Sequence, residues 1–198
     1  MKKICISIFS LLLVTLVACQ AKNDTSASEK DAAIAENAEV TESSDLASSQ
    51  TEEGAKAFIE TVYKTYLNPT AEDEKKLDDA EITIFGMAYM SQYMSDNLQE
   101  KIVEANDKQI ADDTIFFEAD IWTNSQDDTG FKVKEINIVE FTGETATFEV
   151  VLNNGHQDSK VYPIVEYNKD KGCWCVSDFL VSGEKFISMI DDYLNGKD

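Results

Sequence analysis

Arginine is absent from this chain of 198 residues, and its 17 basic residues, all lysine, stand against 38 acidic ones. Nucleic-acid binding needs a basic face, and bidentate hydrogen bonding to phosphate favours the guanidinium group. The net charge of −21 therefore argues against a nucleic-acid partner. Such a charge keeps an exported protein soluble, and it also permits a basic partner protein or divalent cations.

Histidine and cysteine are scarce as well. The one histidine, His156, follows an Asn-Asn-Gly sequence typical of a hairpin tip, where a general base has neither a pocket nor an orienting partner. Cys5 lies in an N-terminal signal and Cys19 is the expected lipidation site described below, which leaves Cys173 and Cys175 as thiols. Residues two apart in a strand lie about 6.6 Å apart, near the upper limit for a disulfide. We interpret this pair as small apolar side chains, with a strained disulfide as the alternative, and we expect no metal and no cofactor.

Long hydrophobic runs are also missing. The longest, residues 4–17, is shorter than the roughly 20 residues that a membrane-spanning helix needs. It follows Lys2 and Lys3 and ends in Leu-Val-Ala-Cys, a pattern typical of a cleaved secretory signal. This segment resembles the signal of bacterial lipoproteins, in which the small side chain of Ala18 admits the peptidase and the thiol of Cys19 takes a diacylglycerol. An ordinary secretory signal is the alternative.

The lipoprotein interpretation divides the chain into a signal peptide (1–18), an acidic disordered tether (19–53) and one domain (54–198). The tether has no aromatic residue from position 20 onward, so it cannot bury enough apolar surface to fold. Two or three acyl chains on Cys19 would anchor the protein firmly, since each contributes about 0.8 kcal/mol per buried CH₂. We expect an envelope location on the outer face of the cell membrane. In a cell with an outer membrane, Gln20 directs the protein there, facing the periplasm.

The negative charge of the protein surface indicates that only the lipid anchors the chain to the membrane. After cleavage, 15 lysines would face 38 acidic residues, a net charge of −23. Anionic lipid headgroups repel such a surface. The membrane is therefore expected to be a partner only through the lipid at Cys19.

The first half of the domain has the hydrophobic period of helices. Apolar residues recur at helical spacing over residues 55–67 and again over about 82–105, where Ser95 is expected to cap a second piece. Residues 71–80 are highly charged, and we expect them to form a loop or an exposed turn.

After residue 130 the period changes to two, which is typical of strands. Alternation predicts a strand from Phe131, with a bulge where the phase shifts near Ile136, and a second strand over 146–152. Turn signals separate two further strands, 161–167 and 173–181, and a short helix closes the chain. This order predicts an α+β fold, with helices on one face of a curved antiparallel sheet of about four strands.

Scattered residues carry a family resemblance over about residues 55–195: Phe58, Tyr63 and Tyr66, the segment from Tyr93 to Leu98, the segment from Asp120 to Asp127, and Trp174 in the last strand. In this order the chain resembles small bacterial lipoproteins that carry a YbjP-like domain of unknown function. That domain belongs to the cone-shaped, nuclear-transport-factor-like superfold. The family implies no established activity, and the superfold hosts enzymes, ligand binders and interaction modules.

Four residues before the strands are the candidate lining of a pocket: Asp120, Trp122, Gln126 and Asp127. The resemblance implies them, because the cavity of this superfold often opens at this junction. A structural aspartate that caps a turn is the alternative for Asp127. The oxygen-rich stretch 124–130 lacks the alternating acids and distal glutamate of a calcium loop, so we interpret it as a turn.

We expect a membrane-anchored envelope lipoprotein whose domain binds a small ligand or a partner protein without catalysing a reaction. One alternative is an enzyme of the superfold's lyase or isomerase type, in which Asp120 or Asp127 acts with a tyrosine. Another is an acidic inhibitor or immunity-like binder of a basic envelope enzyme. A deep polar pocket that holds one of these acids would favour the enzyme.

Overall fold

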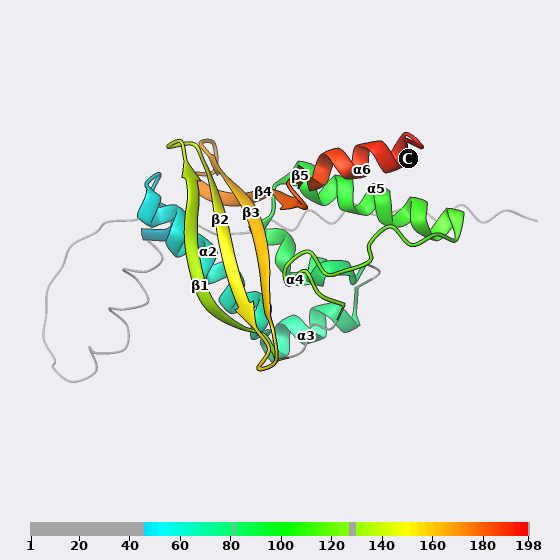
Figure 1. Cartoon of the computed structure of the whole chain (residues 1–198), viewed down its shortest axis with the longest axis horizontal. Helices are drawn as coiled ribbons and strands as arrows, with labels where there is room; N and C mark the ends of the chain where they lie inside the picture. Colours follow the sequence, from blue (N-terminus) through cyan, green and yellow to red (C-terminus); the bar gives the residue numbers. More distant parts are fainter. Residues whose placement is uncertain (1–45, 81, 127–129, 198) are drawn as a thin grey trace, which may run out of the picture. The chain divides into compact units, whose positions relative to one another are not determined.

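The computed structural model describes three stretches of the chain, residues 46–80, 82–126 and 130–197 (Figure 1). The expected lipidation site Cys19, its neighbour Ala18 and the candidate Asp127 lie outside them. Within these stretches, no helix is both long enough and apolar enough to cross a membrane.

Helices precede strands, and a last helix closes the chain. The elements are α2 (Glu52–Leu67), α3 (Ala71–Asp78), the 3-10 turn η1 (Ile84–Gly86), α4 (Met87–Met90), η2 (Ser91–Tyr93), α5 (Asp96–Asp112), β1 (Lys132–Phe141), β2 (Thr145–Asn153), β3 (Asp158–Asn168), β4 (Cys173–Val181), β5 (Glu184–Lys185) and α6 (Phe186–Leu194). The predicted α+β class is confirmed.

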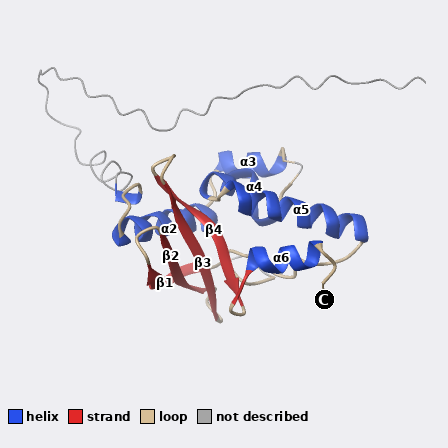
Figure 2. Cartoon of the chain, turned by 90° about the horizontal axis from the view of Figure 1, so that it is seen from above, coloured by secondary structure: helices blue, strands red, loops and turns tan. Residues whose placement is uncertain are grey.

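The strands form one antiparallel sheet in the order β1-β2-β3-β4-β5, so β1 is an edge strand. The fifth strand has only two residues and was not expected. One face of β2 is buried, as its alternation predicts. The buried side chains on that face are Ala146, Phe148, Val150 and Leu152. Helices cover this apolar face: α2 contacts β1, and α6 packs against both β4 and α5 (Figure 2).

Strand β1 is bulged, as the phase shift predicts. Its pairing with β2 slips between Val133 and Glu135 and again between Ile138 and Glu140. Each slip leaves one residue of β1 without an opposite partner, which bends the strand and redirects its side chains. The edge of the sheet nearest α2 is therefore irregular.

Residues 71–80, expected as a loop, instead form helix α3 and the turn after it. A capping box starts this helix: the Thr70 hydroxyl accepts from the Asp73 N–H, and the Asp73 carboxylate accepts from the Thr70 N–H (3.1 Å). Acids in the first turn and lysines in the last also suit the helix dipole. The loop prediction was wrong because this helix is specified by its ends rather than by an apolar stripe.

Ser95 caps α5, as predicted, by accepting from the Leu98 N–H at 3.2 Å. The helix continues to Asp112, beyond the expected end at about 105. The stretch before Ser95 is broken into short helical pieces where Phe85 (φ 55°) and Gly86 (φ 64°) enter the left-handed region. This break leaves the Phe85 carbonyl available to a side chain from a distant loop.

The segment just before α2 contacts the sheet. The indole N–H of Trp174 donates to the Ser49 carbonyl (2.8 Å), and the Tyr167 hydroxyl donates to the Ser48 carbonyl (3.2 Å). A side chain at Gly54 would meet the Ser49 oxygen at 2.0 Å, so only glycine fits there. The expected tether ran to residue 53, whereas contacts with the sheet begin at residue 48.

Candidate functional site

Asp120 lies in the loop between α5 and β1 and organises the turn that follows it. Its Oδ1 accepts from the N–H of Trp122 (2.8 Å), from the N–H of Thr123 (2.9 Å) and from the Thr123 hydroxyl (3.2 Å). Its Oδ2 accepts from the hydroxyl of Tyr66 on α2 (2.6 Å). We call residues 120–125 the Asp120 turn. A hydrogen bond from the Asp120 N–H to the Ser125 carbonyl (2.9 Å) closes it.

Burial raises the pKa of the Asp120 carboxyl above its ordinary value. The hydrogen bonds from Tyr66, Trp122 and Thr123 lower the pKa and so oppose that effect, because they favour the ionised form. The carboxylate is thus desolvated but well supplied with donors.

Trp122 belongs to the core. It is fully buried, and its indole N–H donates to the Phe85 carbonyl at 3.0 Å. Its ring makes an edge contact with Phe179 (centroids 5.1 Å) and another with Tyr63 (6.3 Å). Gln126 is exposed at the surface. Among the candidates that the structure describes, Asp120 is the one that lines a hollow.

That hollow, the Asp120 cavity, has a volume of about 400 Å³ and lies between β3, β4, α6 and the loop before the Asp120 turn. Its walls are mainly aromatic and aliphatic, with a smaller polar part. The apolar part comprises Phe116, Phe117, Ala119, Ile121, Val161, Phe179, Leu180, Val181, Phe186 and Met189, and the polar part comprises Glu118, Asp120, Asn124, Lys160, Tyr162 and Ser182. Both the size and the composition are typical of small-molecule pockets.

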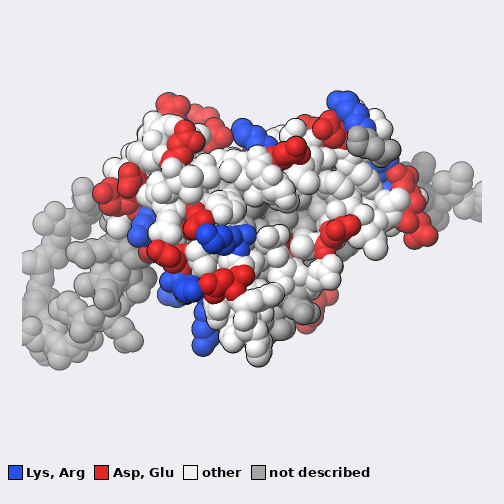
Figure 3. Space-filling model, viewed as in Figure 1, with Lys and Arg blue, Asp and Glu red and all other residues white. Residues whose placement is uncertain are grey.

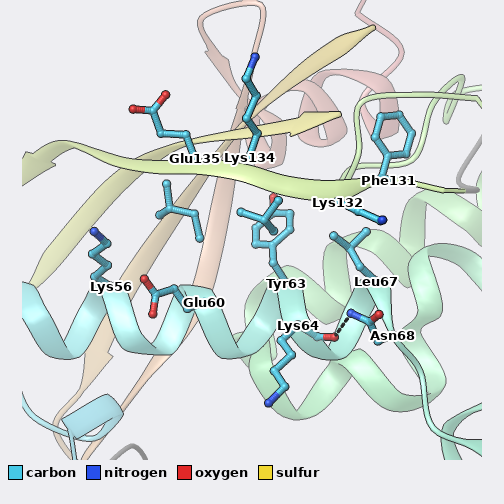
Figure 4. A pocket seen from close by; sticks show the side chains of 12 residues that line it. Lys56, Glu60, Tyr63, Lys64, Leu67, Asn68, Phe131, Lys132, Lys134 and Glu135 are labelled. Carbon is cyan, nitrogen blue, oxygen red and sulfur yellow. Dashed lines mark hydrogen bonds between the residues drawn. The ribbon is translucent and has the colours of Figure 1, made fainter. Parts of the chain in front are cut away.

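A second hollow, the α2–β1 groove, has a volume of about 490 Å³ and is lined by Lys56, Glu60, Tyr63, Lys64, Leu67, Asn68 and residues 131–136. Figure 4 shows Tyr63 rising from α2 toward β1, while Lys134 and Glu135 point from β1 away from α2. Tyr63 is fully buried, and its hydroxyl has no hydrogen-bond partner within the described stretches. Burial, and then the nearby charge of Asp120, raise the pKa of Tyr63 well above its usual value.

Sequence reasoning assigned Tyr63 to an apolar stripe and did not identify this groove. It also missed Asp178, a buried carboxylate on β4 that accepts from the N–H of Ile187 (3.0 Å) at the start of α6. Burial raises the pKa of Asp178. A signal for Asp178 existed, because it occupies an inward position of the alternating strand, in line with Trp174 and Val176.

The remaining reactive side chains are placed as follows. His156 is exposed in the turn between β2 and β3. Cys173 and Cys175 both carry thiols, and burial, then the charge of Glu166, raises the pKa of Cys175 to about 11. A thiol with so high a pKa is protonated and unreactive at neutral pH. In the part of the chain that the structure covers, no three His, Cys, Asp or Glu side chains are grouped as metal ligands.

No protein-family model matches the chain, and neither a curated protein nor a solved structure matches it significantly. Function must therefore be inferred from the two hollows and from the N-terminal sequence.

Proposed function

We propose that this protein is a lipid-anchored envelope lipoprotein whose domain binds a small, largely apolar ligand in the Asp120 cavity. The size and lining of this cavity carry the proposal. A volume of about 400 Å³ suits a small molecule, and aromatic walls with a few polar groups favour apolar binding with a fixed orientation.

The bonding of Asp120 supports binding rather than catalysis. A general base must direct an available lone pair at the proton it removes. Oδ1 of Asp120 already accepts three hydrogen bonds, and Oδ2 accepts one from Tyr66, so the turn and α2 occupy most of the acceptor capacity of this carboxylate. This carboxylate holds the turn and supplies one polar edge to the cavity.

Filling the cavity tests the proposal. Met189 lines the cavity from α6 and is half-buried, so Met189→Trp occupies the space with little disturbance of the core. The control is Val139→Trp, at a β1 position that is 60% exposed and lines neither hollow. With the neutral fluorescent dye N-phenylnaphthylamine as the probe, we expect Met189→Trp to lower the affinity at least tenfold and Val139→Trp to leave it unchanged. Equal affinity of both variants and the parent protein would contradict the proposal.

One contact favours a second candidate, an enzyme of lyase or isomerase type. The Tyr66 hydroxyl donates to Asp120 at 2.6 Å, and Asp120 reaches the cavity wall, so an acid–base pair with a tyrosine is geometrically possible.

We also propose that the domain is YbjP-like and belongs to the nuclear-transport-factor-like superfold. The order of elements and the cavity beside Asp120 support this assignment. Envelope anchoring rests on the sequence that ends at Cys19.

Metabolic labelling with palmitate tests the anchor. Cys19→Ala should abolish the label and release the protein from membranes, whereas the control Cys173→Ala should keep both. Label retained by Cys19→Ala would refute the lipid anchor.

A further inference from the structure

The Tyr63 hydroxyl is a polar group of the α2–β1 groove that lacks a hydrogen-bond partner among the described residues. It is buried, and no hydrogen bond reaches it from residues 46–80, 82–126 or 130–197. Native proteins rarely leave such a group unpaired, because it has lost its water without gaining a replacement. Figure 4 shows the ring directed across the groove at β1. An acceptor atom from a ligand that enters the groove would complete the bonding of Tyr63.

Lysines surround this position. Lys56, Lys64 and Lys132 line the groove, and none has an ion-pair partner among the described side chains. Lys134, by contrast, pairs with Asp158 at 2.6 Å. Figure 3 shows lysines and acidic side chains side by side over the strands on the face that it views. In a chain with a net charge of −21, the groove therefore holds more lysines than acids, since only Glu60 and Glu135 line it beside four lysines.

The groove also has an apolar part, formed by Leu67 from α2, by Phe131 just before β1, and by Val133 and Ile136 from β1. Glu60, Asn68 and Glu135 complete its lining. Val133 is 40% exposed, so this apolar side chain faces solvent at the groove. The slip in pairing that follows Val133 sets the direction of these side chains. An apolar body can therefore lie along the groove beside a charged end.

We propose that the α2–β1 groove binds an organic carboxylate with an apolar body. The carboxylate accepts a hydrogen bond from the Tyr63 hydroxyl, and the Lys64 and Lys132 side chains that line the groove supply positive charge. The apolar body contacts Leu67, Val133 and Ile136. A cation would meet like charge here, and a neutral apolar molecule would leave Tyr63 unpaired, so both bind less well. This site is separate from the Asp120 cavity and does not depend on the function proposed for it.

Removing the hydroxyl tests the head-group contact. The probe is dansylundecanoate, compared with the dansyl amide of undecylamine, which has a similar apolar body and no acceptor at its far end. We expect Tyr63→Phe to lower the affinity for the carboxylate at least tenfold and to leave the affinity for the amide unchanged. Equal loss for both probes, or loss for neither, would overturn the proposal.

Removing the charge gives a matched comparison. Lys64→Gln/Lys132→Gln and Lys75→Gln/Lys185→Gln change the net charge equally, but only the first pair lines the groove. We expect the first pair to lower carboxylate affinity at least tenfold and the second to lower it less than twofold. Equal effects of the two pairs would show general electrostatic attraction and overturn the site.

Two further variants keep the result interpretable. Val133→Trp blocks the groove at an exposed position and should lower carboxylate affinity even if Tyr63→Phe folds poorly. Met189→Trp, in the other cavity, should not change it. Carboxylate binding that is lost in Met189→Trp and kept in Val133→Trp would place the probe in the Asp120 cavity and refute the groove. Loss of dye binding in Met189→Trp is judged separately, so the two proposals can fail independently.

Discussion

Trp122 belongs to the Asp120 turn and contacts Tyr63 of the α2–β1 groove, but these two regions satisfy their polar groups in opposite ways. Tyr66 and Tyr63 lie one turn apart on α2 and both pack against the Trp122 ring. The Tyr66 hydroxyl donates to Asp120 at 2.6 Å, whereas the Tyr63 hydroxyl has no partner in the described structure. The same side chain on the same helix therefore has a structural role in one region and is available to a ligand in the other.

Asp120 and Tyr63 illustrate two roles of a buried polar group, one in stabilising the fold and one in binding a ligand. A carboxylate with a donor for each oxygen fixes the chain around it and is costly to replace. A hydroxyl with no partner lowers the stability of the unliganded fold, and it gives a ligand something to bind. Removing a polar group of the Asp120 turn should therefore lower the free energy of unfolding. Removing the Tyr63 hydroxyl should instead lower ligand affinity without lowering that free energy.

The largest effect is expected from Asp120→Ala. This change leaves the N–H groups of Trp122 and Thr123 and the Tyr66 hydroxyl without their acceptor, and each unsatisfied buried group costs about 1–3 kcal/mol. We expect the free energy of unfolding in urea to fall by about 3 kcal/mol. The control Asp120→Asn keeps an acceptor for the two N–H groups and should lose about 1 kcal/mol. A loss below about 1 kcal/mol in Asp120→Ala would contradict a structural role.

Tyr66→Phe should have the next largest effect. It removes one hydrogen bond to an ionised carboxylate while the ring keeps its contact with Trp122. Hydrogen bonds to charged groups contribute about 1.5–3 kcal/mol, and because this one is partly buried we expect a loss of about 1.5 kcal/mol in the free energy of unfolding. No loss would mean that the Asp120 carboxylate does not need this donor.

The dependence of the unfolding free energy on pH tests the role of Asp120 in a second way. The pKa of Asp120 is raised above 3.8, so the folded protein binds this proton more tightly than the unfolded chain does. The contribution of Asp120 to stability therefore falls as the pH rises from 3.8 to the raised value, and is constant above it. Acids whose pKa is lowered, such as Glu149, act in the opposite sense, but they are common to both proteins in a comparison with Asp120→Asn. The difference in unfolding free energy between parent and Asp120→Asn should decline with pH, and an increase would show a lowered pKa.

Much of the fold could be predicted because its signals are local. The alternation over 146–152 predicts which face of β2 is buried, and Ser95 predicts the start of α5, since both act through neighbouring residues. Helix α3 was missed because the capping box of Thr70 and Asp73 was outweighed by the absence of an apolar stripe.

The site was less predictable because its properties depend on residues far apart in the chain. Asp120 could be selected as a polar residue beside aromatic ones, but its bond with Tyr66 joins positions 54 residues apart. The Tyr63 hydroxyl lacks a hydrogen-bond partner in the described structure because of how distant residues pack around it. The hydrophobic pattern of the sequence does not predict this. The groove lysines come from α2 and β1, so their proximity appears only in the fold.

The most direct test measures Tyr63→Phe beside Tyr66→Phe in one series of urea unfolding experiments without ligand. Because the Tyr63 hydroxyl is buried and unpaired, its removal should leave the free energy of unfolding unchanged or raise it by up to about 1 kcal/mol, while Tyr66→Phe lowers it. A loss in Tyr63→Phe as large as that in Tyr66→Phe would show that the Tyr63 hydroxyl is already bonded in the fold, and would contradict the groove as a binding site.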